Sequence, residues 1–354
     1  MQAGSYLTAT RGYAAREARI CYERAESLCN SLNRPLFLYA ALMGQWRHAN
    51  TIGKLPEALQ IAKLLYLLAE DHNESALLIG ACHAFACTLY FLGEFVGARQ
   101  YAMRAIQTWR SQGVRPPVED VDVPITSTLS FAAISEWHLG EIPSCRATIA
   151  EAISLAKQLN DMHGLVVDLV WAAILGYCER NPSEVERLAS DVIELSTRHH
   201  FAHYMAVGTI LRGWARSVSG NTVEGIAWIE DGIRDFRAIG GITGLANDLR
   251  LKAEALYLAD RTFEALEAIR EAEAILERTG EGHWRAEHHR LHGVLLAAIG
   301  DDETQIEASF CEAIRIAKEQ KSVSLQKRAE ATYAEYRKQK ASALRGRGFR
   351  LPLC

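Results

Sequence analysis

The chain of 354 residues is 49% hydrophobic and 23% charged, and it carries a formal net charge of −4. This composition is that of a folded protein with a sizeable core, and it excludes a disordered polyelectrolyte. A weakly acidic chain also lacks the overall charge of a protein that binds polyanions. The N-terminus has no basic segment followed by an apolar core, so we expect no secretory signal and a cytoplasmic location.

Eight turn positions recur along the chain at an almost constant interval. They are Gly12, Gly53, Gly93, Gly140, Arg180, Gly220, Asp260 and Gly300, at intervals of 41, 40, 47, 40, 40, 40 and 40 residues. An interval of this size is typical of a helical solenoid, in which each helix pair packs on its neighbours. The spacing therefore predicts a single all-α solenoid of about eight helix pairs over residues 1–340.

Small residues stand at fixed distances from these turns. Alanine or glycine occupies six of the seven positions that lie seven residues before the turns from Gly53 onward, and Gly213 is one of them. Gly225 and Gly232 follow the turn at Gly220 by five and twelve residues. Two helices cross closely only where side chains are small. The arrangement matches the tetratricopeptide repeat, whose superhelix is right-handed, although the ~40-residue period is longer than that repeat's standard length of about 34. We interpret these glycines as packing residues.

Three further segments stand out in chain order. The apolar run 76–93 imitates a membrane span, but its position in the repeat predicts a buried helix, so no membrane contact is expected. Prolines and acidic residues at 111–124 predict an exposed loop, either a spacer or a segment that touches a partner. Residues 325–340 predict one more helix, and 341–354 a flexible basic tail.

Motifs of catalysis and cofactor binding are missing. The sequence contains no GxxxxGK[ST], GxSxG, HExxH or glycine-rich dinucleotide loop, so we expect neither an enzyme nor a cofactor. Its eight cysteines form no CxxC pair and predict reduced, buried thiols. His288 and His292 share a helix face, as do His199 and His203, but no third metal ligand is nominated. Packing or surface histidines are the simpler interpretation.

The register of the repeat predicts which side chains line the concave face of the superhelix. Exposed positions there should lie ten, six and three residues before each turn. The candidate groove residues at these positions are Arg47, His83, Tyr90, Trp137, Tyr177, Trp214, Arg250, Tyr257 and Arg290. Aromatic anchors and arginines suit an extended or helical peptide. The alternative is that several of these aromatic side chains only fill space between repeats.

Four segments carry a family resemblance, at residues 11–29, 90–106, 203–229 and 281–301. Its most specific part is GTILRGWA, Gly208 to Ala215, followed by EGI at Glu224 to Ile226. These segments resemble the C-terminal tetratricopeptide region of bacterial class III adenylate cyclases fused to an AAA-type ATPase. The resemblance implies a regulatory region whose cyclase and ATPase domains lie upstream and outside this chain. Members commonly have lysine where His292 stands, which argues against a metal site.

Four functional hypotheses follow. The first is a non-catalytic module that binds a protein or peptide segment in its groove and regulates a signalling cyclase or ATPase, in cis or in trans. The alternative is a domain that senses a small-molecule effector inside the superhelix, near Trp137, Tyr177 and Trp214. A metal enzyme using His288 and His292 is the third. Nucleic-acid binding through the C-terminal arginines is the fourth and is not expected, because the tail lacks aromatic residues other than Phe349.

Overall fold

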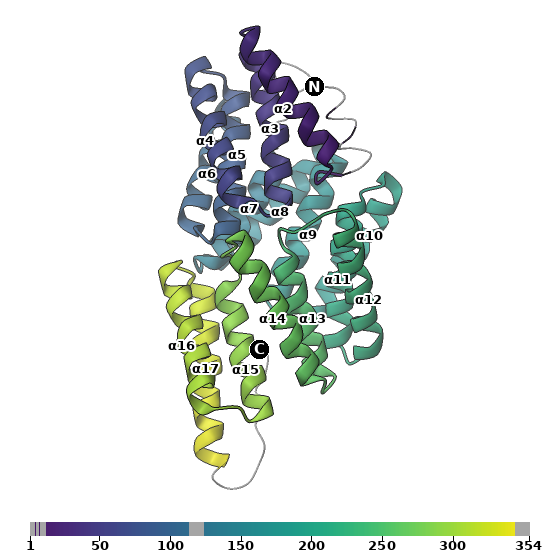
Figure 1. The fold of residues 1–354 in the computed structure, drawn as a ribbon, viewed down its shortest axis with the longest axis vertical. Coiled ribbons are helices and arrows are strands. Elements are labelled where there is room, and N and C mark those ends of the chain that lie inside the picture. Colours follow the sequence, from purple (N-terminus) through teal and green to yellow (C-terminus); the bar gives the residue numbers. More distant parts are fainter. Residues whose placement is uncertain (1–3, 5–6, 8–11, 113–123, 344–354) are drawn as a thin grey trace.

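The structure, a computed structural model, describes residues 4, 7, 12–112 and 124–343 (Figure 1). Within these ranges the chain forms helices and no strand. Helix pairs follow one another as α3 (Pro35–Thr51) and α4 (Leu55–His72), α5 (Ser75–Leu92) and α6 (Phe95–Gln112), α7 (Ile125–His138) and α8 (Ile142–Leu159), α9 (Met162–Cys178) and α10 (Pro182–His199), α11 (Ala202–Val218) and α12 (Thr222–Ala238), α13 (Leu245–Leu258) and α14 (Thr262–Thr279), and α15 (Arg285–Ile299) and α16 (Glu303–Glu319). Helix α2 (Arg16–Ser31) precedes them and α17 (Val323–Ala343) follows. The fold is the predicted right-handed superhelical solenoid of tetratricopeptide-like pairs.

The predicted loop and tail fall largely outside the described part of the chain. Residues 113–123 of the loop and 344–354 of the tail are not described. The last predicted helix is present and somewhat longer than expected, since α17 begins at Val323 and runs to Ala343 rather than ending at residue 340.

Every predicted turn residue has the backbone conformation that a tight turn between helices needs. All eight have positive φ, including the two that are not glycine, Arg180 at 57° and Asp260 at 59°. A second series of positive-φ residues, which the repeat spacing did not reveal, joins successive helix pairs wherever the structure describes the connection; the connection between α6 and α7 lies outside the described residues. Its members are Asn33, Asn73, Asn160, His200, Gly240, Gly280 and Lys321. Both connections of the repeat therefore end a helix in the left-handed region, where glycine and asparagine are least strained.

Glycines bring α11 and α12 into close contact, as the repeat spacing predicted. A Cβ on Gly213 would lie 2.6 Å from the carbonyl oxygen of Gly225, and one on Gly232 would lie 2.8 Å from the carbonyl oxygen of Ala206. The obstacles are backbone atoms, which cannot rotate away. These glycines are packing residues, and they set the distance between the two helix axes.

Helix α5 is long and apolar enough to cross a membrane by length and composition, but it lies inside the solenoid. In its 18-residue window 72% of the residues are buried against neighbouring helices. Its apolar surface is therefore satisfied by packing on α4, α6 and α7.

The superhelix closes on itself, which the sequence analysis did not predict. The amides of Ile242 and Thr243 donate to the carbonyl oxygen of Thr51 at 3.0 and 3.2 Å. Forty residues later the same pattern recurs, because the amides of Gly282 and His283 donate to the carbonyl oxygen of Phe91 at 2.8 and 3.3 Å. We call these contacts between successive superhelical turns the inter-turn seam.

The seam continues at its C-terminal end through side chains. His138 and Ser322 share a hydrogen bond of 2.9 Å, and the hydroxyl of Ser324 donates to the carbonyl oxygen of Trp137. In Figure 1 the C-terminal helices α15 to α17 accordingly lie below the N-terminal helices α4 to α6. A solenoid ordinarily makes contacts between adjacent repeats only. Here each of these helix ends also meets a repeat about 190 residues further along.

Candidate functional site: a buried polar cluster inside the superhelix

The candidate groove residues lie inside the superhelix, but they do not line an exposed groove. His83, Tyr90, Trp137, Tyr177, Trp214, Arg250, Tyr257 and Arg290 are buried, with exposed fractions between 0% and 9%, and Arg47 is half-buried. The expectation that these positions are exposed is therefore wrong. Two causes combine. Tyr90 and Trp137 are covered across the inter-turn seam, where they pack on His283 and Trp284. Trp214 and His83 are covered by neighbouring repeats.

Trp214 and Arg180 meet on one buried carboxylate. The indole N–H of Trp214, on α11, donates to Glu254 Oε2 at 2.8 Å, and Arg180 forms an ion pair with Glu254 Oε1. Arg180 stands in the turn after α9, and its guanidinium lies 5.1 Å from the ring centre of Tyr177. Glu254 is fully buried, so this pairing supplies the countercharge and hydrogen bonds that a buried carboxylate requires.

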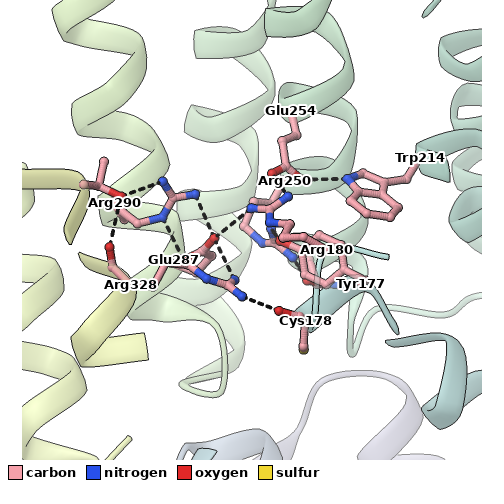
Figure 2. A network of polar contacts seen from close by, with 11 residues as sticks. Tyr177, Cys178, Arg180, Trp214, Arg250, Glu254, Glu287, Arg290 and Arg328 are labelled. Atoms are coloured by element: carbon pink, nitrogen blue, oxygen red, sulfur yellow. Dashed lines mark hydrogen bonds and ion pairs between the residues drawn. The ribbon is translucent and has the colours of Figure 1, made fainter. Parts of the chain in front are cut away.

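Glu287, on α15, gathers arginines from three elements (Figure 2). Arg290 contacts both of its oxygens at 2.9 Å, in the bidentate geometry of a strong pair. Arg328 of α17 approaches Oε1 at 3.3 Å and donates to the carbonyl oxygen of Cys178 at 2.6 Å, while Arg180 lies 3.7 Å from Oε1. Burial alone would raise the pKa of Glu287, but Arg290 and Arg328 outweigh it and hold that pKa below its usual value.

Arg250 occupies the middle of the cluster. Its guanidinium donates to the hydroxyl of Tyr177 and to Asn247 Oδ1. It also lies over the rings of Tyr177 and Trp284, at 4.9 and 5.2 Å from their centres. Arginine stacks readily on aromatic faces, so these rings hold the side chain in place.

Two buried acidic residues of this region, Asp248 and Glu281, have raised pKa values. Burial, together with Glu281, raises the pKa of Asp248 to about 8, and burial raises the pKa of Glu281 itself to about 7. The buried cluster thus holds four guanidinium groups, Arg180, Arg250, Arg290 and Arg328, against the two paired carboxylates Glu254 and Glu287. The interior is therefore rich in positive charge, although the chain as a whole is acidic.

Buried histidines and a tyrosine surround this charge. Burial lowers the pKa of His283 to about 3, and it lowers the pKa of His138 and His288 well below the usual value, so all three are neutral near pH 7. In the described part of the chain, both ring nitrogens of His288 and the hydroxyl of Tyr90 have no hydrogen-bond partner. Such buried polar atoms usually have a partner, so this interior has capacity for further polar contacts.

The histidine pairs considered for metal binding have other surroundings. His292 Nδ1 lies 3.1 Å from Glu273 Oε1, whereas His288 is buried beside Arg250 and His283. His199 stacks on Phe201, and His203 packs on Phe236. Across residues 12–112 and 124–343, no group of three or more His, Cys, Asp or Glu side chains is placed to hold a metal.

The repeat register predicted some members of the buried cluster but not others. It identified Tyr177, Trp214, Arg250 and Arg290, and it placed His83 with them, although His83 bonds to Thr128 in the N-terminal half. It missed Arg180, Glu287, Trp284 and Arg328 as members of the site. One signal was available for Arg180, since it is the basic residue among turn positions otherwise held by glycine or aspartate.

Comparison with known proteins places the fold. No family model matches the chain. A curated relative, the uncharacterized protein R02095 of Rhizobium meliloti (strain 1021), is 22% identical over 340 residues, which are 94% of this chain. Those residues are 32% of the relative, so the chain spans about a third of its length.

Solved structures share the architecture at low identity. A Rap protein complexed with competence and sporulation factor has a TM-score of 0.62 at 11% identity, covering 96% of this chain and 97% of its own. NprR in complex with its cognate peptide NprX has 0.60 at 10% identity, covering 96% and 98%. The human IFIT1 dimer with m7Gppp-AAAA has 0.54 at 12% identity, covering 93% and 70%. At these identities the likeness concerns the fold, and the chain is a tetratricopeptide-like helical-repeat protein.

Proposed function

We propose that this chain is a non-catalytic, peptide-binding regulatory module that takes a protein segment onto its concave face. The observation that carries the proposal is the convergence of Tyr177, Trp214 and Arg250 from three successive repeats on one buried cluster. Aromatic rings and arginines are the side chains that most often anchor a bound segment. A solenoid that needed only stability would fill these positions with aliphatic residues, because buried ion pairs are a poor source of stability.

Similarity of fold supports the same proposal. The Rap protein and NprR were solved with a bound factor or cognate peptide, and both cover nearly all of this chain. Helical-repeat proteins of this size can therefore bind a peptide. The resemblance to cyclase and ATPase proteins supports a regulatory role toward upstream domains in cis. A relative about three times as long has room for further domains.

Binding on the concave face requires that the inter-turn seam opens. The seam combines backbone and side-chain hydrogen bonds, each contributing roughly 0.5–1.5 kcal/mol, with aromatic contacts such as those of Tyr90 with His283 and Trp137 with Trp284. Opening it therefore breaks packing as well as hydrogen bonds. A ligand that contacts the interior only in the open form would shift the population toward that form. The seam is thus the element through which a bound segment changes the shape of the module.

The direct test uses peptides and two matched variants. A randomised decapeptide library is passed over the immobilised chain, and each retained peptide is titrated by fluorescence anisotropy. We expect Tyr177→Phe to weaken binding roughly tenfold, because it removes the hydroxyl that positions Arg250. Trp228→Phe, on α12 and outside the cluster, should leave Kd unchanged. Failure to retain any peptide, or equal Kd values for both variants, would contradict the proposal.

A small-molecule effector is the second candidate. The unpartnered polar atoms of His288 and Tyr90 favour it, because a small polar ligand would supply the hydrogen-bond partners that these buried atoms lack. A ligand that binds the folded form raises Tm by mass action. A metabolite screen by thermal shift in which no compound raises Tm would count against this candidate.

A further inference from the structure

Arg250 and Arg290 occupy the same position of successive repeats but have different partners. Both side chains are fully buried, and each stands ten residues before its turn. Arg290 is neutralised by Glu287, three residues before it, through two contacts of 2.9 Å. The residue three before Arg250 is Asn247, whose amide oxygen accepts a hydrogen bond but brings no charge.

Arg250 is therefore a buried guanidinium without a countercharge of its own. Among the residues that the structure describes, no carboxylate oxygen lies within ion-pair distance of it, and its Nε has no hydrogen-bond partner. Of the neighbouring acids, Glu281 accepts from the amide of Gly244 at 3.1 Å, and within the described residues no hydrogen bond or ion pair joins Asp248 to Arg250. An unpaired buried charge costs several kcal/mol, so a site of this kind favours an arriving anion.

We propose that Arg250 binds a carboxylate of the ligand peptide, either a side-chain carboxylate or the C-terminal one, in the place that Glu287 fills beside Arg290. The proposal rests on the peptide-binding function argued above. A planar guanidinium pairs with a carboxylate through two parallel hydrogen bonds, and the rings of Tyr177 and Trp284 already fix its orientation.

Access to this position lies at the seam. Asn247 is half-buried in the first turn of α13, four residues after Thr243. Thr243 crosses the seam, since its amide donates to the carbonyl oxygen of Thr51 and its hydroxyl to that of Asn50. Separation of this contact would free the start of α13, where Asn247 lies. Arg250 is covered by Tyr177 and Trp284, so access to its guanidinium also requires that Trp284 moves with the seam residue His283 before it.

The difference between the two repeats supplies the decisive variant. Asn247→Glu gives Arg250 the internal carboxylate that Arg290 already has, without removing Arg250. The control is Gln60→Glu, which adds the same charge at an exposed position of α4. The probes are succinate and inorganic phosphate at matched ionic strength against chloride, and decapeptide libraries made either with free carboxyl groups or with amidated termini and no acidic residue.

For the wild-type chain and Gln60→Glu, we expect succinate to raise Tm above the chloride value and the carboxylate-bearing library to be retained at least about tenfold better than the neutral one. In Asn247→Glu and in Arg250→Gln both differences should disappear.

A Tm rise with phosphate but not succinate, or an equal succinate effect in Asn247→Glu, overturns the carboxylate assignment. Equal retention of the two libraries overturns it while leaving peptide binding in place. A response to succinate that depends on Arg250, without retention of either library, supports the carboxylate site and contradicts the peptide-binding function. No response to any probe overturns both.

Discussion

Trp214 and Glu254 stand forty residues apart, at the same position of successive repeats, and are joined by an indole N–H to carboxylate hydrogen bond of 2.8 Å. Trp214→Phe would keep most of the packed ring but leave Glu254 Oε2 without this donor. We expect the free energy of unfolding to fall by about 1–3 kcal/mol, the cost of a buried acceptor without a partner. Urea denaturation measures it, with Trp228→Phe as the matched control. Equal losses in the two variants would show that the hydrogen bond contributes nothing beyond the ring.

Glu287 is a single carboxylate shared by three arginines, Arg290, Arg328 and Arg180. Glu287→Gln leaves Arg290 and Arg328 buried beside a neutral amide, so we expect a loss of about 3–5 kcal/mol in the free energy of unfolding. Adding Arg290→Met should restore part of that loss, since one unpaired charge is then removed. The comparison is a double-mutant cycle by urea denaturation. Strict additivity of the two changes would exclude a direct energetic coupling.

The inter-turn seam can be opened by a single methyl group. A Cβ on Gly282 would lie 2.3 Å from the carbonyl oxygen of Leu92, across the seam, and its φ is not in the left-handed region. We expect Gly282→Ala to increase the radius of gyration measured by small-angle X-ray scattering, with helical circular dichroism preserved. Gly97→Ala, inside α6, meets one side-chain atom at 3.2 Å and should leave the radius unchanged. An unchanged radius in both variants would mean that the seam accommodates the methyl group.

Glu281 should make stability depend on pH. Burial raises its folded-state pKa from 4.5 to about 7, so the fold favours the protonated form. Its contribution is complete below pH 4.5 and is lost as pH rises through 7. Glu281→Gln mimics the protonated acid. Relative to this variant, the wild-type chain should lose up to about 3 kcal/mol of unfolding free energy between pH 5 and pH 8.

The measurement for Glu281 is urea denaturation at intervals of pH, and the variant provides its own baseline. The low pKa of His283 acts in the other direction, because its stabilising effect is lost as pH falls from 6.5 toward 3. The same slope between pH 5 and pH 8 in both chains would show that Glu281 remains ionised in the fold.

The local architecture could be predicted from the sequence because it depends on contacts between neighbouring repeats. Gly213 and Gly225 sit where backbone atoms touch, and all eight turn residues have positive φ. Their spacing can be read from the sequence, because the residues that touch lie within about forty positions of one another. Trp46 is the exception in the small-residue series, and its indole N–H is satisfied by Thr88 of the next repeat at 3.0 Å.

Closure could not be predicted because it is the sum of many small rotations between repeats. The sequence around Gly282 and Ile242 contains no pattern that indicates a contact with residues about 190 positions away. Without that contact, the concave face is expected to be exposed. The same limit applies to the cluster. Arg250 and Trp214 follow from register, whereas Arg328 reaches the site from α17 and Arg180 from a turn.

The seam also changes how the molecule should come apart. An open solenoid behaves as a one-dimensional array whose terminal repeats fray first and whose loss propagates inward. Here the ends of α3, α5 and α7 are tied to the segments before α13, α15 and α17, so the first repeats cannot loosen without disturbing the last. Such distant ties slow folding, because the chain must close a long loop before the contacts form. The same ties should make the repeats unfold together in one cooperative transition. A ligand that opens the seam should let the two halves of the solenoid unfold separately.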